Sequence, residues 1–176
     1  MFVKVIRAFF AIAAATGVAA SITGYFASLA GVILRDLPWL IILSTGAILV
    51  QIPIGVLEYS SLNSVIFSWK AFVLLDGIPW LQTRPRVCVR TLRLFWFLTM
   101  ANFIWFGIRA SGGVPEIKDD IYILNSHGKI LKILTESEFL ALKSEYLRCF
   151  LALMVFCYMA AVIYWWFPCN HIQQSE

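Results

Sequence analysis

The residues that could carry chemistry are few, and their spacing matches no catalytic or metal-binding pattern. The histidines His127 and His171 are expected in a turn and in the polar tail, so we expect no haem held by two histidines of this chain. The cysteines form no CxxC pair, and two of the four fall in an apolar run; they lie at positions 88, 149, 157 and 169. These features argue against a disulfide framework and against a zinc site. No HExxH, GxSxG or nucleotide-binding glycine pattern occurs, and no pair of aspartates is expected within the membrane, so we expect neither an enzyme nor a cofactor.

The composition indicates an integral membrane protein of one domain. Hydrophobic residues make up 61% of the 176 residues, only 14% are charged, and the mean hydropathy is +0.82. Ordinary globular chains are roughly 45–50% apolar and about 25% charged. The formal net charge of +4 is modest and comes from residues beside apolar runs, so it indicates membrane orientation rather than nucleic-acid binding.

Four apolar runs are long enough to be membrane-spanning helices. About 20 residues are needed to cross a hydrocarbon core of about 30 Å. The first run is too long for the apolar part of a cleaved signal peptide, so we expect a retained span. The predicted spans are residues 8–34, 37–57, 90–108 and 147–167, in an all-α membrane domain covering residues 1–176.

The segment between the second and third spans allows two interpretations. Residues 60–82 are apolar enough for a further span, but Lys70 and Asp76 would then lie within the membrane. Each such charge costs about 2.5–3.5 kcal/mol at a helix centre. We therefore expect an interfacial or re-entrant helix here, with Trp69 and Trp80 at the level of the lipid headgroups.

A basic stretch at the start of the third span predicts the orientation of the protein. Its arginines are Arg84, Arg86, Arg90 and Arg93. Loops rich in Lys and Arg remain on the cytoplasmic side of a membrane. With four spans, this stretch lies on the same side as Lys4 and Arg7. Both termini are therefore expected in the cytoplasm, with the protein in the plasma membrane or a bacterial inner membrane.

Small and polar residues within the spans indicate helix packing. Gly17 and Gly24 lie one heptad apart among other small residues, which predicts a face of the first span that packs closely on another helix. Gly46, in the second span, is expected to tolerate a bulky side chain better than Gly24. Gln51 should hydrogen-bond to a neighbouring helix, close to a kink at Pro53.

The loop of residues 110–146 is expected outside the membrane and to contain a β-hairpin. Ile121–Leu124 and Ile130–Leu134 are β-prone runs, and the residues between them suit a type I turn followed by a bulge. Residues 111–115 resemble a linker. Thr135 and Glu138 have the spacing of a capping box, so a helix should begin there and continue into the last span.

The predicted hairpin has more apolar side chains than one packed face needs. The apolar residues are Tyr122, Ile123, Leu124, Leu131 and Ile133, and together they are more than one packed face requires. His127 lies in the turn between the strands. An isolated two-stranded hairpin is at best marginally stable in water. The surplus apolar face, or an unpaired strand edge, is therefore a candidate partner-binding surface. The other interpretation, of equal weight, is that the hairpin only plugs the mouth of the bundle.

Short motifs resemble two groups of four-span proteins. Thr16-Gly17, Gly24 to Phe26, Leu57 to Tyr59, and Thr83-Arg84 with Val89-Arg90 are similar to the p22-phox family, the light chains of the phagocyte NADPH oxidase. That resemblance implies four spans, cytoplasmic termini and a role in stabilising a haem-bearing catalytic partner. The chain lacks a proline-rich C-terminal tail of the kind found in that family. Separately, Tyr122-x-Leu124-x-x-His127-Gly128, followed by Glu145-x-Leu147-Arg148-x-Phe150, is similar to uncharacterised small bacterial four-span proteins.

These observations favour a non-catalytic partner over two alternatives. The expected role is a stabilising subunit, or an immunity or defence protein, that engages another membrane protein as well as lipid. A homo-oligomeric channel or small transporter is the alternative, with Gln51, Pro53 and the small-residue face of the first span lining or packing a pore. An intramembrane enzyme would need a buried nucleophile or metal set, which the sequence does not contain.

Overall fold

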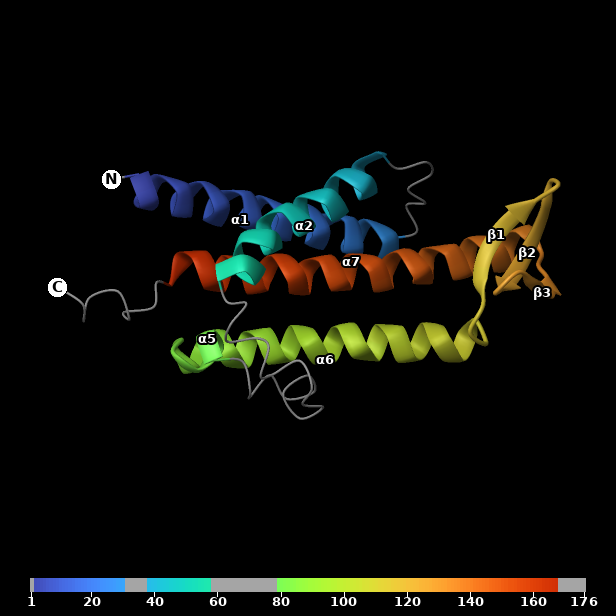
Figure 1. The fold of residues 1–176 in the computed structure, drawn as a ribbon. Helices are drawn as coiled ribbons and strands as arrows, with labels where there is room; N and C mark the ends of the chain where they lie inside the picture. Colours follow the sequence, from blue (N-terminus) through green and yellow to red (C-terminus); the bar gives the residue numbers. More distant parts are fainter. Residues whose placement is uncertain (1, 31–37, 58–78, 168–176) are drawn as a thin grey trace.

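The computed structural model describes residues 2–30, 38–57 and 79–167, which form a bundle of long helices with a small sheet at one end (Figure 1). The start of α1 and the end of α7 lie at the end of the bundle opposite the sheet. The helices are α1 (Phe2–Leu29), α2 (Pro38–Leu57), the short α5 (Pro79–Gln82), α6 (Arg86–Arg109) and α7 (Glu136–Trp166). The strands are β1 (Val114–Lys118), β2 (Ile121–Ser126) and β3 (Lys129–Ile133).

Four of these helices are long and apolar enough to cross a membrane, as the sequence predicted. They fit a multi-pass membrane protein. Helix α6 begins at Arg86, four residues before the expected span, and α7 begins at Glu136, directly after the expected cap. The expected continuation of the first span to residue 34, and most of the expected interfacial or re-entrant helix of residues 60–82, lie outside the described residues.

Helix α7 is the element on which α1, α2 and α6 all pack. Its 31 residues correspond to a length of about 46 Å, well beyond the roughly 30 Å of a hydrocarbon core. Side chains on several sides of α7 are buried, because neighbours cover it from more than one direction. Helix α6, by contrast, buries only one stripe: Leu92, Trp96 and Thr99, at i, i+4 and i+7.

The close packing of α1 and α2 on α7 centres on Tyr158. A Cβ added at Gly17 of α1 would lie 2.3 Å from the Tyr158 ring, so only glycine leaves room for that ring. A Cβ at Gly46 of α2 would lie 2.5 Å from the Tyr158 hydroxyl oxygen. That hydroxyl donates a 2.7 Å hydrogen bond to the carbonyl oxygen of Leu43. Gly46 is therefore confined by one atom of Tyr158, whereas Gly17 faces the ring itself. Gly24 is buried, and its expected lower tolerance relative to Gly46 stays a prediction.

Polar side chains add hydrogen bonds between the helices. Gln51 Nε2 of α2 donates to the carbonyl oxygen of Cys157 at 2.7 Å, which supplies the partner expected for this amide. The hydroxyl of Thr99 on α6 bonds to the carbonyl oxygen of Ala152 at 3.1 Å. In a medium without water, such bonds satisfy groups that would otherwise be left without partners.

The sheet has three antiparallel strands in the order β1-β2-β3, rather than the two of the expected hairpin. Residues 114 and 115, interpreted from sequence as part of a linker, belong to β1 and pair with Asn125 and Leu124. Pro115 argued against a strand when the sequence was considered alone. Proline is tolerated at this position because β1 is an edge strand.

Both hairpins of the sheet turn through two residues with positive φ. These residues are Asp119 and Asp120 in the first turn, and His127 and Gly128 in the second. Positive φ at both central positions is the mark of a type I′ turn, so the expected type I turn is wrong. A register shift is present, but it lies between Leu124 and Asn125 rather than in the turn.

Helix α7 begins where the sequence predicted. Thr135 is its N-cap, and its hydroxyl accepts a hydrogen bond from the Glu138 amide. The Glu138 carboxylate accepts one from the Thr135 amide at 2.9 Å, which completes the capping box. Since β3 ends at Ile133, the cap turns the chain directly from the sheet into α7.

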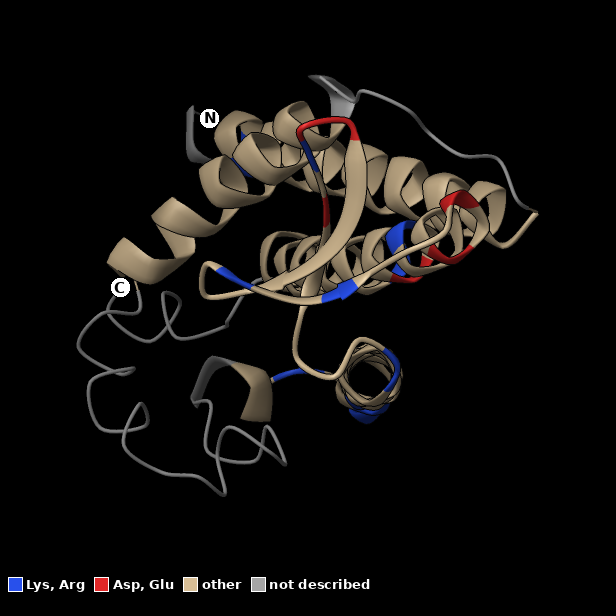
Figure 2. Cartoon of the chain, turned by 90° about the vertical axis from the view of Figure 1, so that its right-hand side faces the viewer, with Lys and Arg blue, Asp and Glu red and all other residues tan. Residues whose placement is uncertain are grey.

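Charged residues are distributed unequally between the two ends of the bundle, which Figure 1 shows from the side. Figure 2 colours the charged residues. Figure 2 looks onto the sheet end, where the strands pass across the end of α7 and α6 is seen along its axis. All acidic residues in the described part belong to this end: Glu116, Asp119, Asp120, Glu136, Glu138 and Glu145. The starts of α1 and α6, at the opposite end, carry basic residues: Lys4, Arg7, Arg84, Arg86, Arg90 and Arg93.

The contact of Tyr158 with Gly17 predicts that alanine lowers the stability of the bundle at Gly17 but not at an open glycine. Gly17→Ala should destabilise the bundle by about 1–3 kcal/mol, because the new methyl group must displace a packed ring. Gly55→Ala is the matched control, since no atom lies within 4 Å of a Cβ at Gly55. Heating in detergent, followed by size-exclusion chromatography, should give a lower melting temperature only for Gly17→Ala. Equal melting temperatures would contradict this packing.

Candidate functional site

A groove lies between the sheet and the first turns of α7 and is the candidate functional site. Its volume is about 780 Å³. Apolar and charged side chains from α6, the sheet and α7 share its lining. These residues are Arg109, Ser111, Leu124, Leu131, Lys132, Leu134, Ser137, Glu138, Ala141 and Leu142.

The short connection between β3 and α7 creates the groove. Only Leu134 and Thr135 separate the strand from the helix, so β3 and the first turns of α7 form adjacent walls. Lys132 Nζ lies 2.7 Å from Glu138 Oε1, which joins the two walls by an ion pair. This pair is exposed to water, which screens the attraction between its charges, so it orients the walls more than it stabilises them.

The inner side of the sheet is held by an apolar cluster on α7. Leu124, Leu134 and Phe139 are buried there with Ala110 and Leu142. The Tyr122 ring lies against Phe139, with ring centroids 4.7 Å apart. Such aromatic contacts add about 0.5–1.5 kcal/mol beyond their burial.

The four residues predicted as a partner surface therefore lie in different environments. Tyr122 and Leu124 pack against α7, although Leu124 also borders the groove. Leu131 lines the groove and remains 48% exposed, while His127 is exposed in the β2–β3 turn. The structure thus brings Leu124 and Leu131 to one groove and leaves His127 outside its lining.

Much of the sheet's apolar surface remains exposed. Strand β3 is exposed along all five of its residues and is paired only with β2. Exposed apolar side chains occur on all three strands: Val114, Ile117, Ile121, Ile130, Leu131 and Ile133. A strand edge with such side chains is a surface that other polypeptides can pair with or cover.

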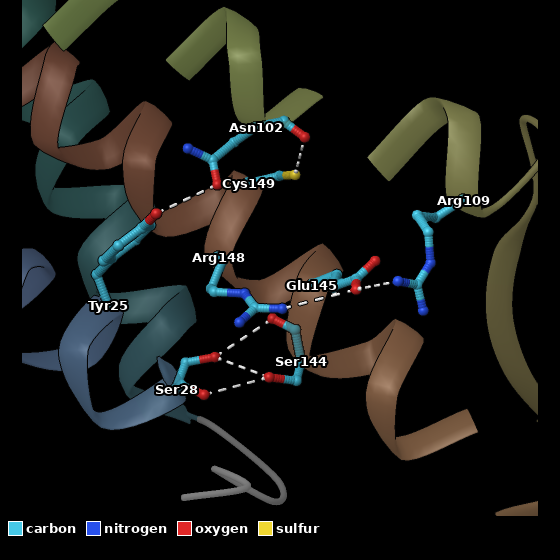
Figure 3. A network of polar contacts seen from close by, with 8 residues as sticks. All are labelled: Tyr25, Ser28, Asn102, Arg109, Ser144, Glu145, Arg148 and Cys149. Atoms are coloured by element: carbon cyan, nitrogen blue, oxygen red, sulfur yellow. Dashed lines mark hydrogen bonds and ion pairs between the residues drawn. The ribbon is translucent and has the colours of Figure 1, made fainter. Parts of the chain in front are cut away.

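Glu145 belongs to a network of polar contacts next to Arg109, one of the groove residues (Figure 3). Its residue is 8% exposed, and its Oε1 lies 3.5 Å from Arg109 Nη1 and 3.8 Å from Arg148 Nη2. Its Oε2 is buried without a hydrogen-bond partner among the described residues. Arg109 also lines the groove, so one guanidinium belongs to both the groove and the Glu145 pair.

Further polar contacts beside Glu145 join three helices. The Ser28 and Ser144 hydroxyls lie 3.1 Å apart and connect α1 to α7. The Tyr25 hydroxyl bonds to Asn102 Oδ1 at 3.2 Å, which connects α1 to α6. The Cys149 thiol donates to the Asn102 carbonyl oxygen at 3.2 Å, which connects α7 to α6 (Figure 3).

A small cavity of about 170 Å³ borders this network. It is lined by Tyr25, Leu29, Asn102, Trp105, Phe106, Glu145, Arg148 and Cys149. The sequence offered one signal for these contacts, the i,i+3 spacing of Glu145 and Arg148 on a helix. The pairing of Arg109 with Glu145 depends on how α6 is rotated against α7, which a single sequence does not show.

The other predicted residues lie away from the groove. Gly17, Gly24 and Gln51 are in the helix-packing region, where Gly17 and Gln51 contact α7. The four arginines of the basic stretch lie together at the opposite end of the bundle. In the described part of the chain, no three His, Cys, Asp or Glu side chains are grouped as metal ligands would be.

The geometry of Glu145 predicts a structural cost for removing its charge. Glu145→Gln should lower the stability by about 1 kcal/mol, because Arg109 and Arg148 lose a common counter-ion, and exposure of Arg109 limits the effect. Glu136→Gln is the control, since Glu136 is exposed in the first turn of α7. Thermal unfolding in detergent should show a lower melting temperature for Glu145→Gln only. Unchanged melting temperatures would mean that the pair contributes nothing.

The groove has the mixed apolar and polar lining of a site for a polypeptide segment. The contacts around Glu145 hold three helices together. No protein-family model matches the chain, and no curated protein or solved structure matches it either.

Proposed function

We propose that this protein is a non-catalytic partner subunit that binds a segment of another membrane protein in the sheet–α7 groove. The observation that carries the proposal is the groove itself, which is about 780 Å³ in volume and has exposed Leu131 on one wall. Apolar side chains next to placed polar groups are typical of binding sites. The exposed edge of β3 offers the partner a second means of attachment, by strand pairing.

The charges of the groove favour an apolar segment that carries a carboxylate. Glu138 neutralises Lys132 across the groove. The Arg109 side chain is 48% exposed, and its ion pair with Glu145 is long at 3.5 Å. A guanidinium has five N–H donors, so Arg109 can hold Glu145 and accept a second carboxylate at the same time.

Two further considerations support a partner role. The short motifs that resemble p22-phox light chains belong to a family whose members stabilise another membrane protein. The channel alternative draws on Gln51 and the small-residue face of α1. Within one copy, Gln51 is bonded to Cys157 and Gly17 lies against Tyr158, so these groups already serve packing inside the bundle.

The proposed orientation places the sheet outside the cell and both termini in the cytoplasm. The uneven distribution of charge supports it, because the starts of α1 and α6 carry only basic residues among their charged groups. The acidic residues of the described part lie at the sheet end, and arginine-rich ends are retained in the cytoplasm. A partner that meets the groove would then be an extracytoplasmic segment of a neighbouring membrane protein.

Cysteine labelling tests this orientation. In a background without native cysteines, Ser126→Cys in the sheet should react with an impermeant maleimide on intact cells. Gln82→Cys, which is exposed at the opposite end, should react only after the membrane is permeabilised. The reverse pattern would invert the topology, and labelling of both sites on intact cells would contradict four spans.

Substitution in the groove tests the partner role. Leu131→Asp should reduce association with the partner at least tenfold, because it places a charge where an apolar side chain would be buried. Ile117→Asp is the matched control, since Ile117 is similarly exposed at 53% but lies on β1, outside the groove lining. A photo-crosslinking residue at each position, followed by mass spectrometry of native membranes, would identify what each one touches.

The outcomes of this experiment are distinct. A crosslink to one membrane protein from position 131, absent from position 117 and lost in Leu131→Asp, supports the proposal. Crosslinks only to a second copy of this chain would favour the homo-oligomeric alternative. Equal crosslinking from both positions would mean that the groove has no special role.

A further inference from the structure

A second cleft lies at the end of the bundle opposite the sheet, between α5 and the first turns of α6. Its volume is about 430 Å³. The described residues of its lining include four arginines, two aliphatic side chains and an amide: Leu81, Gln82, Arg84, Arg86, Val89, Arg90 and Arg93. No acidic residue occurs among them.

The start of α6 explains why these arginines converge. Pro85 is the N-cap, and Arg86, Arg90 and Arg93 follow at i, i+4 and i+7, so they share one face of the helix. At 100° per residue, this face lies about 120° around the helix from the buried stripe at Leu92, Trp96 and Thr99. The arginines therefore flank the packing surface of α6 instead of competing with it.

Arg84 forms a buried wall of the cleft. It is 6% exposed, and its guanidinium carbon lies 5.6 Å from the centre of the Tyr164 ring on α7. A cation over an aromatic face is attracted to the ring, and the contact orients the planar guanidinium. The backbone amide of Arg84 also donates a hydrogen bond to the carbonyl oxygen of Leu81 at 3.1 Å, which fixes the backbone beside the cleft.

Arg86 and Arg90 lie one helical turn apart on this face, and both are exposed at the cleft. Each has five N–H donors in a planar fork, which matches the oxygen atoms of a phosphate group. Like charges at i and i+4 of a helix repel one another, so an anion beside Arg86 and Arg90 lowers the electrostatic energy. The chemistry of the cleft is therefore that of a phosphate site.

The position of the cleft indicates which kind of molecule carries the phosphate group. It lies at the start of a helix that is apolar enough to span a membrane, and Leu81 and Val89 supply apolar walls. Basic pockets at the membrane surface bind lipid headgroups, whose acyl chains then lie along the adjoining span. Val87, on the same helical turn, is 71% exposed and available to an acyl chain.

We propose that this arginine cleft is a binding site for the phosphate headgroup of an anionic phospholipid. The assignment is independent of the partner proposed for the groove, which lies at the other end of the bundle. The lipid would join α5 and α6 at the membrane surface, where these two elements border the same cleft.

The full-length protein, purified in detergent micelles, permits a direct test by native mass spectrometry. Phosphatidylglycerol and phosphatidylcholine are titrated separately, and inorganic phosphate is added at millimolar concentration as a competitor. The test variant is the double substitution Arg86→Gln with Arg90→Gln. The matched control removes two charges at the sheet end, by Lys118→Gln with Lys129→Gln.

A second variant, Arg86→Lys with Arg90→Lys, keeps the charge and removes the bidentate fork. The wild type should retain phosphatidylglycerol at least tenfold better than phosphatidylcholine. The glutamine pair should weaken retention of phosphatidylglycerol by roughly tenfold or more, and the lysine pair severalfold. The control pair should bind as the wild type does.

Three results would overturn the assignment. Equal retention of the two lipids would show that the cleft does not distinguish an anionic headgroup from a zwitterionic one. Equal loss in the control pair would mean that only the net charge matters. Displacement of the lipid by inorganic phosphate would show that the cleft takes a free anion and not a lipid. If the glutamine pair fails to fold, the lysine pair decides the question, and full retention by it would count against the guanidinium forks.

Discussion

The bundle depends most on the packing of the Tyr158 ring against two glycines of neighbouring helices. Gly17 on α1 and Gly46 on α2 both leave space for this one side chain of α7, and its hydroxyl reaches a carbonyl of α2. In lipid, apolar surface gives little drive for helices to associate, so close contact and hydrogen bonds must hold them together. Tyr158 supplies both, which explains why α7 lies between its neighbours.

The sheet depends on the same helix by a different route. Leu124, Leu134 and Phe139 form a small core on the start of α7. In the proposed orientation the sheet lies in water, where the hydrophobic effect stabilises such a core. The groove is what this core leaves uncovered, with Leu131 and Arg109 in its lining. Because Arg109 also contacts Glu145, a ligand that draws Arg109 away would disturb the network that joins α1, α6 and α7.

The sequence predicted those features that depend on local pattern. Apolar length identified the four helices, and Thr135 with Glu138 identified the start of α7, because both signals are contained within a few turns of chain. Strand β1 was missed because Pro115 and its charged neighbours carry no strand signal, and only pairing with β2 makes it a strand. The turn type was wrong because a histidine with positive φ is uncommon and is imposed by the two-residue hairpin.

The length of α7 has a consequence for which molecules can reach the groove. From the predicted membrane boundary at Leu147 back to the groove residues of 137–142 is five to ten residues, or about 7–15 Å along a rigid helix. The length of this helical segment therefore fixes the distance between the groove and the predicted membrane boundary. A chain leaving the same membrane in extended form would cover this height with about two to five residues. In the proposed arrangement, the groove would therefore meet the residues of a neighbouring membrane protein that directly follow its span.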